Sequence, residues 1–206
     1  MKPGQQGYSN PPGLKSAGVV ILAAGSSERM KSPKAFLAFD DHSTFIEQII
    51  STYYNWGSRE IAVVVNRENE KVLKNLKSIP PQVVVVTNNR PEYERFFSVK
   101  LGIGAIQTSG YCFIQNVDNP FIDGEILDLL YQNKSSFEYV LPVYNNKGGH
   151  PVLLNRKNMN YIRNWPVNNS NLKDVLHEMK GKRVVMKDDK VLININQETD
   201  YRKIVG

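Results

Sequence analysis

The chain has 206 residues, 41% of them hydrophobic, which is enough for one domain with a sizeable core. Its formal net charge of +6 is dispersed, which suits an anionic small molecule at least as well as a nucleic acid. The single cysteine, Cys112, cannot form an internal disulfide, and no run approaches the ~18 apolar residues of a membrane span. We expect a cytoplasmic protein, monomeric or homodimeric, with no nucleic-acid or membrane partner and with Cys112 buried.

Residues 1–15 contain several Pro and Gly residues and almost nothing to bury. This composition predicts a disordered leader, followed by a single domain over residues 16–206.

The next part of the chain alternates apolar runs with segments of helical spacing. Strands are predicted at residues 19–24, 61–65, 83–86 and 111–117, and helices at 44–55, 68–76, 98–106 and 126–131, the last begun by Asp123. Gly102 and Gly104 lack the third glycine of a dinucleotide fingerprint, so close helix packing explains them better.

In the last third, residues 139–143 and 152–154 flank an Asn-Asn-Lys-Gly-Gly turn and are predicted to pair as a hairpin. We expect a helix at 171–179, strands at 183–186 and 191–195, and a closing helix at 198–204. The order of elements predicts an α/β fold with a mostly parallel sheet and helices on both faces. Ligands bind such sheets at the carboxyl ends of the strands.

The loop after the first strand has a composition suited to holding a polyphosphate. Gly25 permits a backbone turn that other residues resist, and Ser26 and Ser27 are small enough to let a ligand approach. Arg29 and Lys34 can neutralise phosphate oxygens. A surface loop with solvated charges explains the same composition equally well, and the P-loop pattern is absent.

Two further segments contain candidate functional residues. Asp118 follows a predicted strand and precedes Pro120, which suits a magnesium ligand, and a turn or helix-capping aspartate is the alternative. His150 follows two glycines and can hydrogen-bond at a pocket edge or serve a structural role. The three histidines show no metal-binding spacing, and no serine–histidine–acid arrangement is apparent.

Six segments together resemble one family. Leu22-Ala-Ala-Gly25-Ser-Ser-Glu-Arg29-Met30, followed by Pro33-Lys34, resembles the opening signature of the MobA-like nucleotidyltransferases. Later segments are similar to further elements of that family in the same order: residues 93–102, Val117-Asp118-Asn119-Pro120, Gly149-His150-Pro151-Val152-Leu153, residues 171–176 and residues 194–201.

This resemblance implies a three-layer, Rossmann-like (GT-A-like) fold with a small β-hairpin extension. It implies an enzyme that transfers a nucleoside monophosphate from an NTP to a phosphorylated acceptor, releases pyrophosphate and uses Mg²⁺. Ala23-Ala24 before the glycine is more typical of members that use CTP. That feature is shared by molybdenum cofactor cytidylyltransferases and by sugar- or polyol-phosphate cytidylyltransferases.

The resemblance also implies roles at the matching positions. The catalytic residues would be Arg29, Lys34 and Asp118, with Asp118 and Asn194 as metal ligands. Gly149 and His150 would bind the acceptor. The nucleotide would be bound by Leu22, Ala23, Ala24, Gly25, Ser26, Ser27, Arg29, Lys34 and Ser98.

The chain departs from the family pattern at several positions. Val117 stands where a glycine usually precedes the metal aspartate, and Asn194 stands where an acid is frequent. The other departures are Lys31, Phe97 and Glu198. They leave the second metal ligand open, with Asp188 or Asp189 as alternatives, and they motivate a second hypothesis: a catalytically weakened nucleotide-binding or sensor protein on the same fold.

Overall fold

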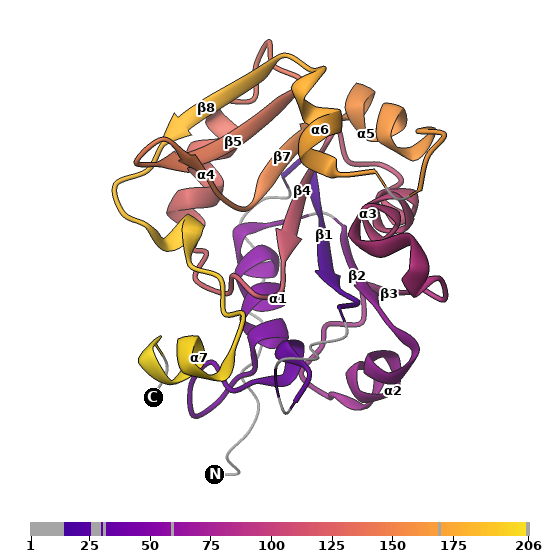
Figure 1. The fold of residues 1–206 in the computed structure, drawn as a ribbon, viewed down its shortest axis with the longest axis vertical. Helices are drawn as coiled ribbons and strands as arrows, with labels where there is room; N and C mark the ends of the chain where they lie inside the picture. Colours follow the sequence, from indigo (N-terminus) through magenta and orange to yellow (C-terminus); the bar gives the residue numbers. More distant parts are fainter. Residues whose placement is uncertain (1–14, 26–29, 31, 59, 169, 205–206) are drawn as a thin grey trace.

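The computed structural model describes residues 15–25, 30, 32–58, 60–168 and 170–204. In this part of the chain, an eight-stranded sheet lies between two layers of helices (Figure 1). The strand order is β3-β2-β1-β4-β7-β5-β6, and β8 pairs with β5. The predicted three-layer α/β fold is confirmed, whereas the predicted leader, apart from Lys15, lies outside the described residues.

One half of the sheet is parallel. β1 (Ala17–Ala23) pairs with β2 (Ile61–Val65) on one side and with β4 (Tyr111–Asn116) on the other, and β3 (Val83–Thr87) continues the sheet beyond β2. β1 is buried along its whole length because helices cover both faces.

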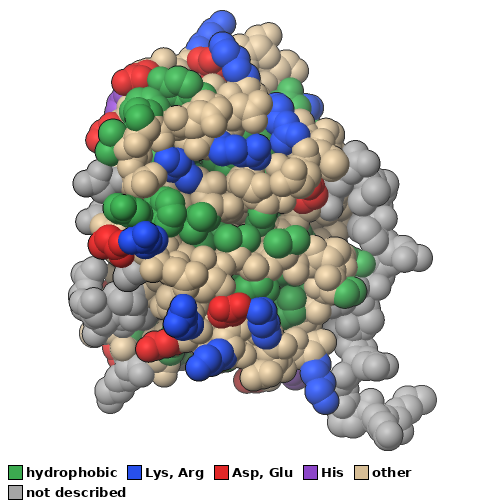
Figure 2. All heavy atoms as spheres, turned by 90° about the vertical axis from the view of Figure 1, so that its right-hand side faces the viewer, with side chains coloured by type: hydrophobic (Ala, Val, Ile, Leu, Met, Phe, Trp, Pro, Cys, Tyr) green, Lys and Arg blue, Asp and Glu red, His purple; other side chains and the backbone are tan. Residues whose placement is uncertain are grey.

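β3 forms one edge of the sheet, and Val84 is 49% exposed there. Figure 2, which looks onto the side of α2 and α3, shows hydrophobic side chains in a band between lysines and arginines. No other described strand pairs with the outer side of β3.

The other half of the sheet contains the predicted hairpin. β5 (Tyr139–Tyr144) turns into β6 (Lys147–Gly148) through Asn145 and Asn146, which both have positive φ angles of 47° and 63°. β7 (Val152–Asn155) runs antiparallel between β4 and β5, and β8 (Gly181–Val185) pairs parallel with β5. The hairpin prediction is confirmed.

Alternate residues of β1 face two separate cores. The odd-numbered positions pack against one helical layer, and Val20 and Leu22 pack against the other. The first layer consists of α1 (Phe45–Trp56), α2 (Arg67–Asn75) and α4 (Gly124–Gln132); the second consists of α3 (Glu94–Ala105), α5 (Arg156–Arg163) and α6 (Leu172–His177).

Side chains cap several of these helices where the sequence predicts their starts. Thr44 and Glu47 form a capping box on α1, and the Asp123 carboxylate accepts a hydrogen bond from the backbone N–H of Ile126 (3.0 Å). The closing helix α7 (Glu198–Ile204) has its predicted bounds. α5 was not predicted; it begins after Asn155, whose side chain accepts from Asn158 N.

One predicted strand is wrong. Residues 191–195 form part of a short 3₁₀ turn, η3 (Lys190–Leu192), and then an extended segment that pairs with no described strand. Val191 and Ile195 are buried because the segment crosses the edge of the core, and this burial produces the strand-like apolar pattern. The backbone of this segment instead bonds to His150 and Asp118.

Three smaller expectations can be compared with the structure. Close packing is confirmed at Gly102, where an added Cβ would lie 2.2 Å from Val20 Cγ1, but a Cβ at Gly104 would meet nothing within 4 Å. Cys112 is fully buried, as expected. None of the described helices has the length and hydropathy needed to cross a bilayer.

Candidate active site

The carboxyl ends of β1 and β4 lie side by side. The two strands are parallel neighbours, with Leu22 opposite Asn116, and Val117 N donates to Leu22 O (3.2 Å). Ala24 and the turn that contains Asp118 therefore emerge at the same edge of the sheet. This is the position where ligands bind in open α/β sheets, and the structure joins the two segments that the sequence had singled out.

The side chain of Asp118 is 26% exposed and only partly satisfied. Its Oδ1 is buried and has no hydrogen-bond partner among the described residues, and its Oδ2 lies 3.9 Å from Lys34 Nζ. Burial raises the pKa of Asp118, and the positive charges of Lys34 and Arg95 oppose that rise. A buried carboxylate oxygen without a partner is costly, so the geometry favours a cation ligand at this atom.

A buried polar network fixes the turn that carries Asp118. Gln115 Nε2 donates to the carbonyls of Asn116 and Asn119 (both 2.8 Å), and Tyr53 donates to Gln115 Oε1 (3.2 Å). Asn119 Nδ2 in turn donates to the carbonyl oxygens of Lys190 (3.0 Å) and Ile193 (2.6 Å).

This network ties the Asp118 turn to the closing segment. Ile195 N donates to Asp118 O (2.8 Å), which continues the connection made by Asn119. Gln115 was not predicted as a site residue, and Asn119 was predicted only as part of the Val117–Pro120 segment. A signal was present, because Gln115 and Asn116 end a strand that is otherwise apolar and buried.

Lys34 reaches the site from η1 (Lys34–Phe36), which follows the predicted phosphate loop. Its Nζ donates to Asn196 Oδ1 (3.0 Å), and its side chain is only 15% exposed. Ala35 and Phe36 pack in the core on the α1 side of the sheet, so the lysine is held on that face. The structure therefore brings together Lys34 and Asp118, as the sequence predicts.

Arg95, in the first turn of α3, was not predicted as a site residue. Its Nη2 donates to Asn116 Oδ1 and lies 3.3 Å from His150 Nε2. The side chain as a whole is exposed, but its guanidinium is surrounded by neighbouring groups. Burial of the guanidinium lowers the pKa of Arg95, and the negative charge of Asp118 opposes that shift. Arginine remains charged under these conditions.

His150 is neutral in this arrangement. Burial, assisted by the charge of Arg95, lowers the pKa of His150 to about 3. Because arginine can only donate, Nε2 of His150 must accept, and the ring proton is assigned to Nδ1. The backbone N–H of His150 donates to Val191 O (3.0 Å), which places the residue against the closing segment.

Gly149 is required for packing. An added Cβ would lie 2.3 Å from Val191 O, so the glycine permits the close approach of residues 190–195. Gly25 differs from expectation, because its φ lies outside the left-handed region and a Cβ there would meet nothing within 4 Å. The turn that Gly25 was predicted to permit lies over residues 26–29, outside the described residues.

Other predicted residues lie close to the site in supporting positions. Ala23 O accepts from the buried Asn69 Nδ2 (3.0 Å), which fixes the end of β1. Ser98 is buried, and its hydroxyl oxygen accepts from Asn88 Nδ2 (2.9 Å). Leu22 is buried, Ala24 is half-buried, and both belong to the segment that ends β1. Nucleotide binding by these residues stays a prediction.

The candidates for a second metal ligand occupy different positions. Asn194 Nδ2 donates to Leu192 O (3.0 Å), and Asn194 adjoins Ile195, which bonds to Asp118. Asp188 lies 3.8 Å from Lys190 and accepts from its backbone N–H. In the described part of the chain, no three His, Cys, Asp or Glu side chains gather as a metal cluster. Ser26, Ser27, Arg29 and Lys31 lie outside the described residues.

Comparison with known families identifies the family of this chain. Residues 19–184 match the MobA-like NTP transferase domain. The chain belongs to the MobA-like NTP transferase domain family. The family predicted from the six segments is therefore confirmed.

Curated relatives of this MobA-like chain are named probable molybdenum cofactor guanylyltransferases. The protein from Methanosarcina acetivorans is 27% identical over 131 residues, which cover 62% of this chain and 57% of the relative. The one from Clostridium perfringens strain 13 is 25% identical over 197 residues, covering 90% and 94%.

Solved structures confirm the fold. Rv0371c from Mycobacterium tuberculosis H37Rv has a TM-score of 0.76 at 18% identity, covering 93% of this chain and 98% of that one. The 4-diphosphocytidyl-2C-methyl-D-erythritol synthase of Anaerococcus prevotii has a TM-score of 0.73 at 15% identity, covering 92% and 96%. At these identities the likeness establishes a shared architecture.

Proposed function

We propose that this protein transfers a nucleoside monophosphate from an NTP to a phosphorylated small-molecule acceptor and releases pyrophosphate. The observation that carries the proposal is the position of Asp118. It lies at the carboxyl end of β4, beside the end of β1, with one buried carboxylate oxygen unpartnered and with cations from Lys34 and Arg95 close by. Family membership supports the same reaction class.

The residues present fit a magnesium ion. Mg²⁺ prefers oxygen ligands and is commonly held by one or two carboxylates together with substrate phosphates and water. Asp118 Oδ1 supplies one such oxygen, and the amide of Asn194 is the proposed second protein ligand. When bound, the ion would neutralise phosphate charge.

The charged side chains suit an electrostatic mechanism. Lys34, together with Arg29 from the preceding loop, is proposed to bind the phosphates of the NTP and to stabilise the charge that grows on the leaving pyrophosphate. The entering phosphate is already an anion, so no general base is required. The neutral state of His150, with a pKa of about 3, agrees with a reaction that does not use it as a base.

The base of the nucleotide is the finer part of the proposal. Ala23-Ala24 favours CTP and hence a molybdopterin or sugar-phosphate cytidylyltransferase, whereas the names of the curated relatives favour GTP. A competition between CTP and GTP for the Mg²⁺-loaded protein distinguishes the two.

The test is pyrophosphate release. The protein is incubated with each of the four NTPs, Mg²⁺ and candidate acceptors, including molybdopterin and sugar phosphates, and release is followed continuously. We expect release with one NTP and one acceptor class, and its loss in Asp118→Asn. Tight NTP binding without release for any acceptor would refute transfer and support the nucleotide-binding or sensor alternative.

A further inference from the structure

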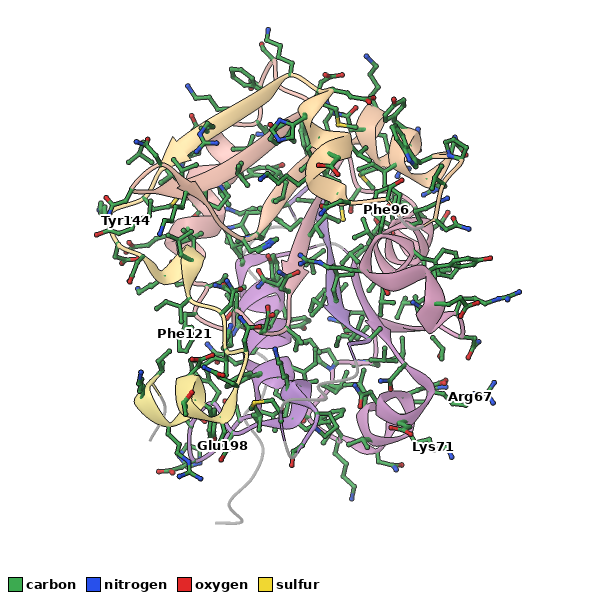
Figure 3. The ribbon with its side chains drawn as sticks, in the orientation of Figure 1. Arg67, Lys71, Phe96, Phe121, Tyr144 and Glu198 are labelled. Carbon is green, nitrogen blue, oxygen red and sulfur yellow. The ribbon has the colours of Figure 1, made fainter. Side chains whose placement is uncertain are left out.

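Asp118 is approached by two cations from opposite faces of the sheet. Lys34 follows the loop after β1, and its neighbours Ala35 and Phe36 pack in the core on the α1 side. Arg95 lies on α3, where the next residue, Phe96, packs in the core on the other side (Figure 3). Both charges are close enough to Asp118 to lower its pKa against the effect of burial.

This arrangement matches the geometry of the proposed reaction. In phosphoryl and nucleotidyl transfer, the entering and leaving oxygens lie roughly in line on opposite sides of the phosphorus. Lys34 adjoins the predicted triphosphate loop, so we place the leaving pyrophosphate on the Lys34 side of Asp118. The entering phosphate then belongs on the side of Arg95.

Arg95 has the donors that such a phosphate requires. Its Nη2 is engaged by Asn116 and His150, but Nη1 and Nε make no hydrogen bond with the described residues. Arginine presents its N–H groups as a planar fork that matches two phosphate oxygens. The side chain is exposed, so a ligand can reach it.

His150 holds the guanidinium in place. It accepts through Nε2 at 3.3 Å from Arg95 Nη2, and Asn116 Oδ1 accepts from the same nitrogen. Both acceptors are anchored: Asn116 ends β4, and His150 is bonded through its backbone to Val191. His150 is therefore placed to orient Arg95.

We propose that Arg95 binds the phosphate of the acceptor and that His150 is its positioning residue. This inference rests on the proposed function. An oxygen of the acceptor phosphate forms a bond to the α-phosphorus, the bond from that phosphorus to the α,β-bridging oxygen breaks, and pyrophosphate leaves with the electron pair. Arg95 neutralises the entering anion and reduces its repulsion from the triphosphate.

The test uses inorganic phosphate as the probe. The full-length protein is loaded with Mn²⁺ and a non-hydrolysable α,β-methylene NTP, and the ³¹P relaxation of added phosphate is measured as a function of its concentration. We compare Arg95→Gln, Arg95→Lys and Lys34→Gln with Arg67→Gln. Arg67 lies on α2, toward the outer side of the molecule in Figure 3, and serves as the matched charge control.

We expect Arg95→Gln to weaken phosphate binding at least tenfold while the affinity for the NTP analogue changes less than twofold. The phosphate affinity of Arg95→Lys should lie between those of Arg95→Gln and the unaltered protein, because lysine keeps the charge but lacks the planar fork. Lys34→Gln should instead weaken binding of the NTP analogue, and Arg67→Gln should change neither the phosphate affinity nor the analogue affinity. His150→Leu should weaken phosphate binding without affecting the analogue, and His150→Gln should restore it because the amide oxygen can accept from Arg95.

Several results would overturn the assignment. The first is that the Mn²⁺-loaded, unaltered protein does not enhance the ³¹P relaxation of added phosphate. The second is unchanged phosphate binding in both Arg95 variants, and the third is loss of NTP-analogue binding in Arg95→Gln. If these results appear while pyrophosphate release proceeds, only the role of Arg95 is wrong. If Arg95 binds phosphate but no acceptor supports release, the transferase itself is refuted, and with it the assignment of that phosphate to an acceptor.

Discussion

Replacing Gly102 by Ala tests how closely α3 must approach the sheet. The new Cβ would lie 2.2 Å from Val20 Cγ1 and 2.9 Å from Val64 Cγ2. Both valines are fully buried, so neither can move without displacing the core. This overpacking should lower the free energy of unfolding by about 3 kcal/mol, and the better helix propensity of alanine should raise it by about 1 kcal/mol. The net loss of stability is about 2 kcal/mol.

Gly104 is the matched control in the same helix. A Cβ there meets nothing within 4 Å, so Gly104→Ala should stabilise the protein by about 0.5–1 kcal/mol through helix propensity alone. Urea unfolding of both variants, with the slope checked for constancy, measures the two free energies of unfolding.

The same pair of variants has a functional consequence. Gly102 lies two turns beyond Arg95 on α3, so a displaced helix should also reduce phosphate binding in Gly102→Ala and leave it unchanged in Gly104→Ala. If Gly102→Ala is as stable as the unaltered protein, the claim that the glycine is needed for close packing is refuted.

Three further predictions concern single side chains. Asp118→Asn should weaken Mn²⁺ binding in the presence of NTP at least about tenfold, as measured by electron paramagnetic resonance titration; equal affinity would exclude Asp118 as a ligand. Because the pKa of His150 is lowered to about 3, turnover should show no titration of His150 between about pH 5.5 and 8, and an inflection near 6.5 that disappears in His150→Gln would contradict this. Burial tends to raise the pKa of Glu60, but hydrogen bonds from residues 107–109 outweigh it and lower the pKa from 4.5, so its stabilisation is present at neutral pH and is lost on acidification. Glu60→Gln should therefore cost about 1–2 kcal/mol in urea unfolding at pH 7 and less below that pKa, and a cost that does not depend on pH would refute the role of the carboxylate.

The sheet and most helices were predictable because burial leaves a periodic signal. The parallel strands are continuous apolar runs, and α1 and α4 begin at residues with capping side chains. The same signal misled at residues 191–195, where burial occurs without strand pairing. α5 was missed because its sequence is mostly polar, with Met159 and Ile162 as its buried apolar residues.

The site was predictable where it follows strand ends. Asp118 and Lys34 were found because motif and topology place them at the carboxyl edge of the sheet. Arg95 lies in the family-like segment 93–102, but its role was missed because its partners, Asn116 and His150, are 21 and 55 residues away. Gly149 was assigned to the acceptor, although its contact with Val191 requires the fold to be known.

The closing segment has a consequence for where the working unit ends. The family model matches residues 19–184, yet the Oδ1 atom that accepts from Lys34 belongs to Asn196, and the backbone partner of Asp118 is Ile195. A chain cut at residue 184 would lose the segment that contacts both Lys34 and Asp118. Substitutions in this short segment can therefore shift Lys34 and Asp118 while residues 19–184 stay the same.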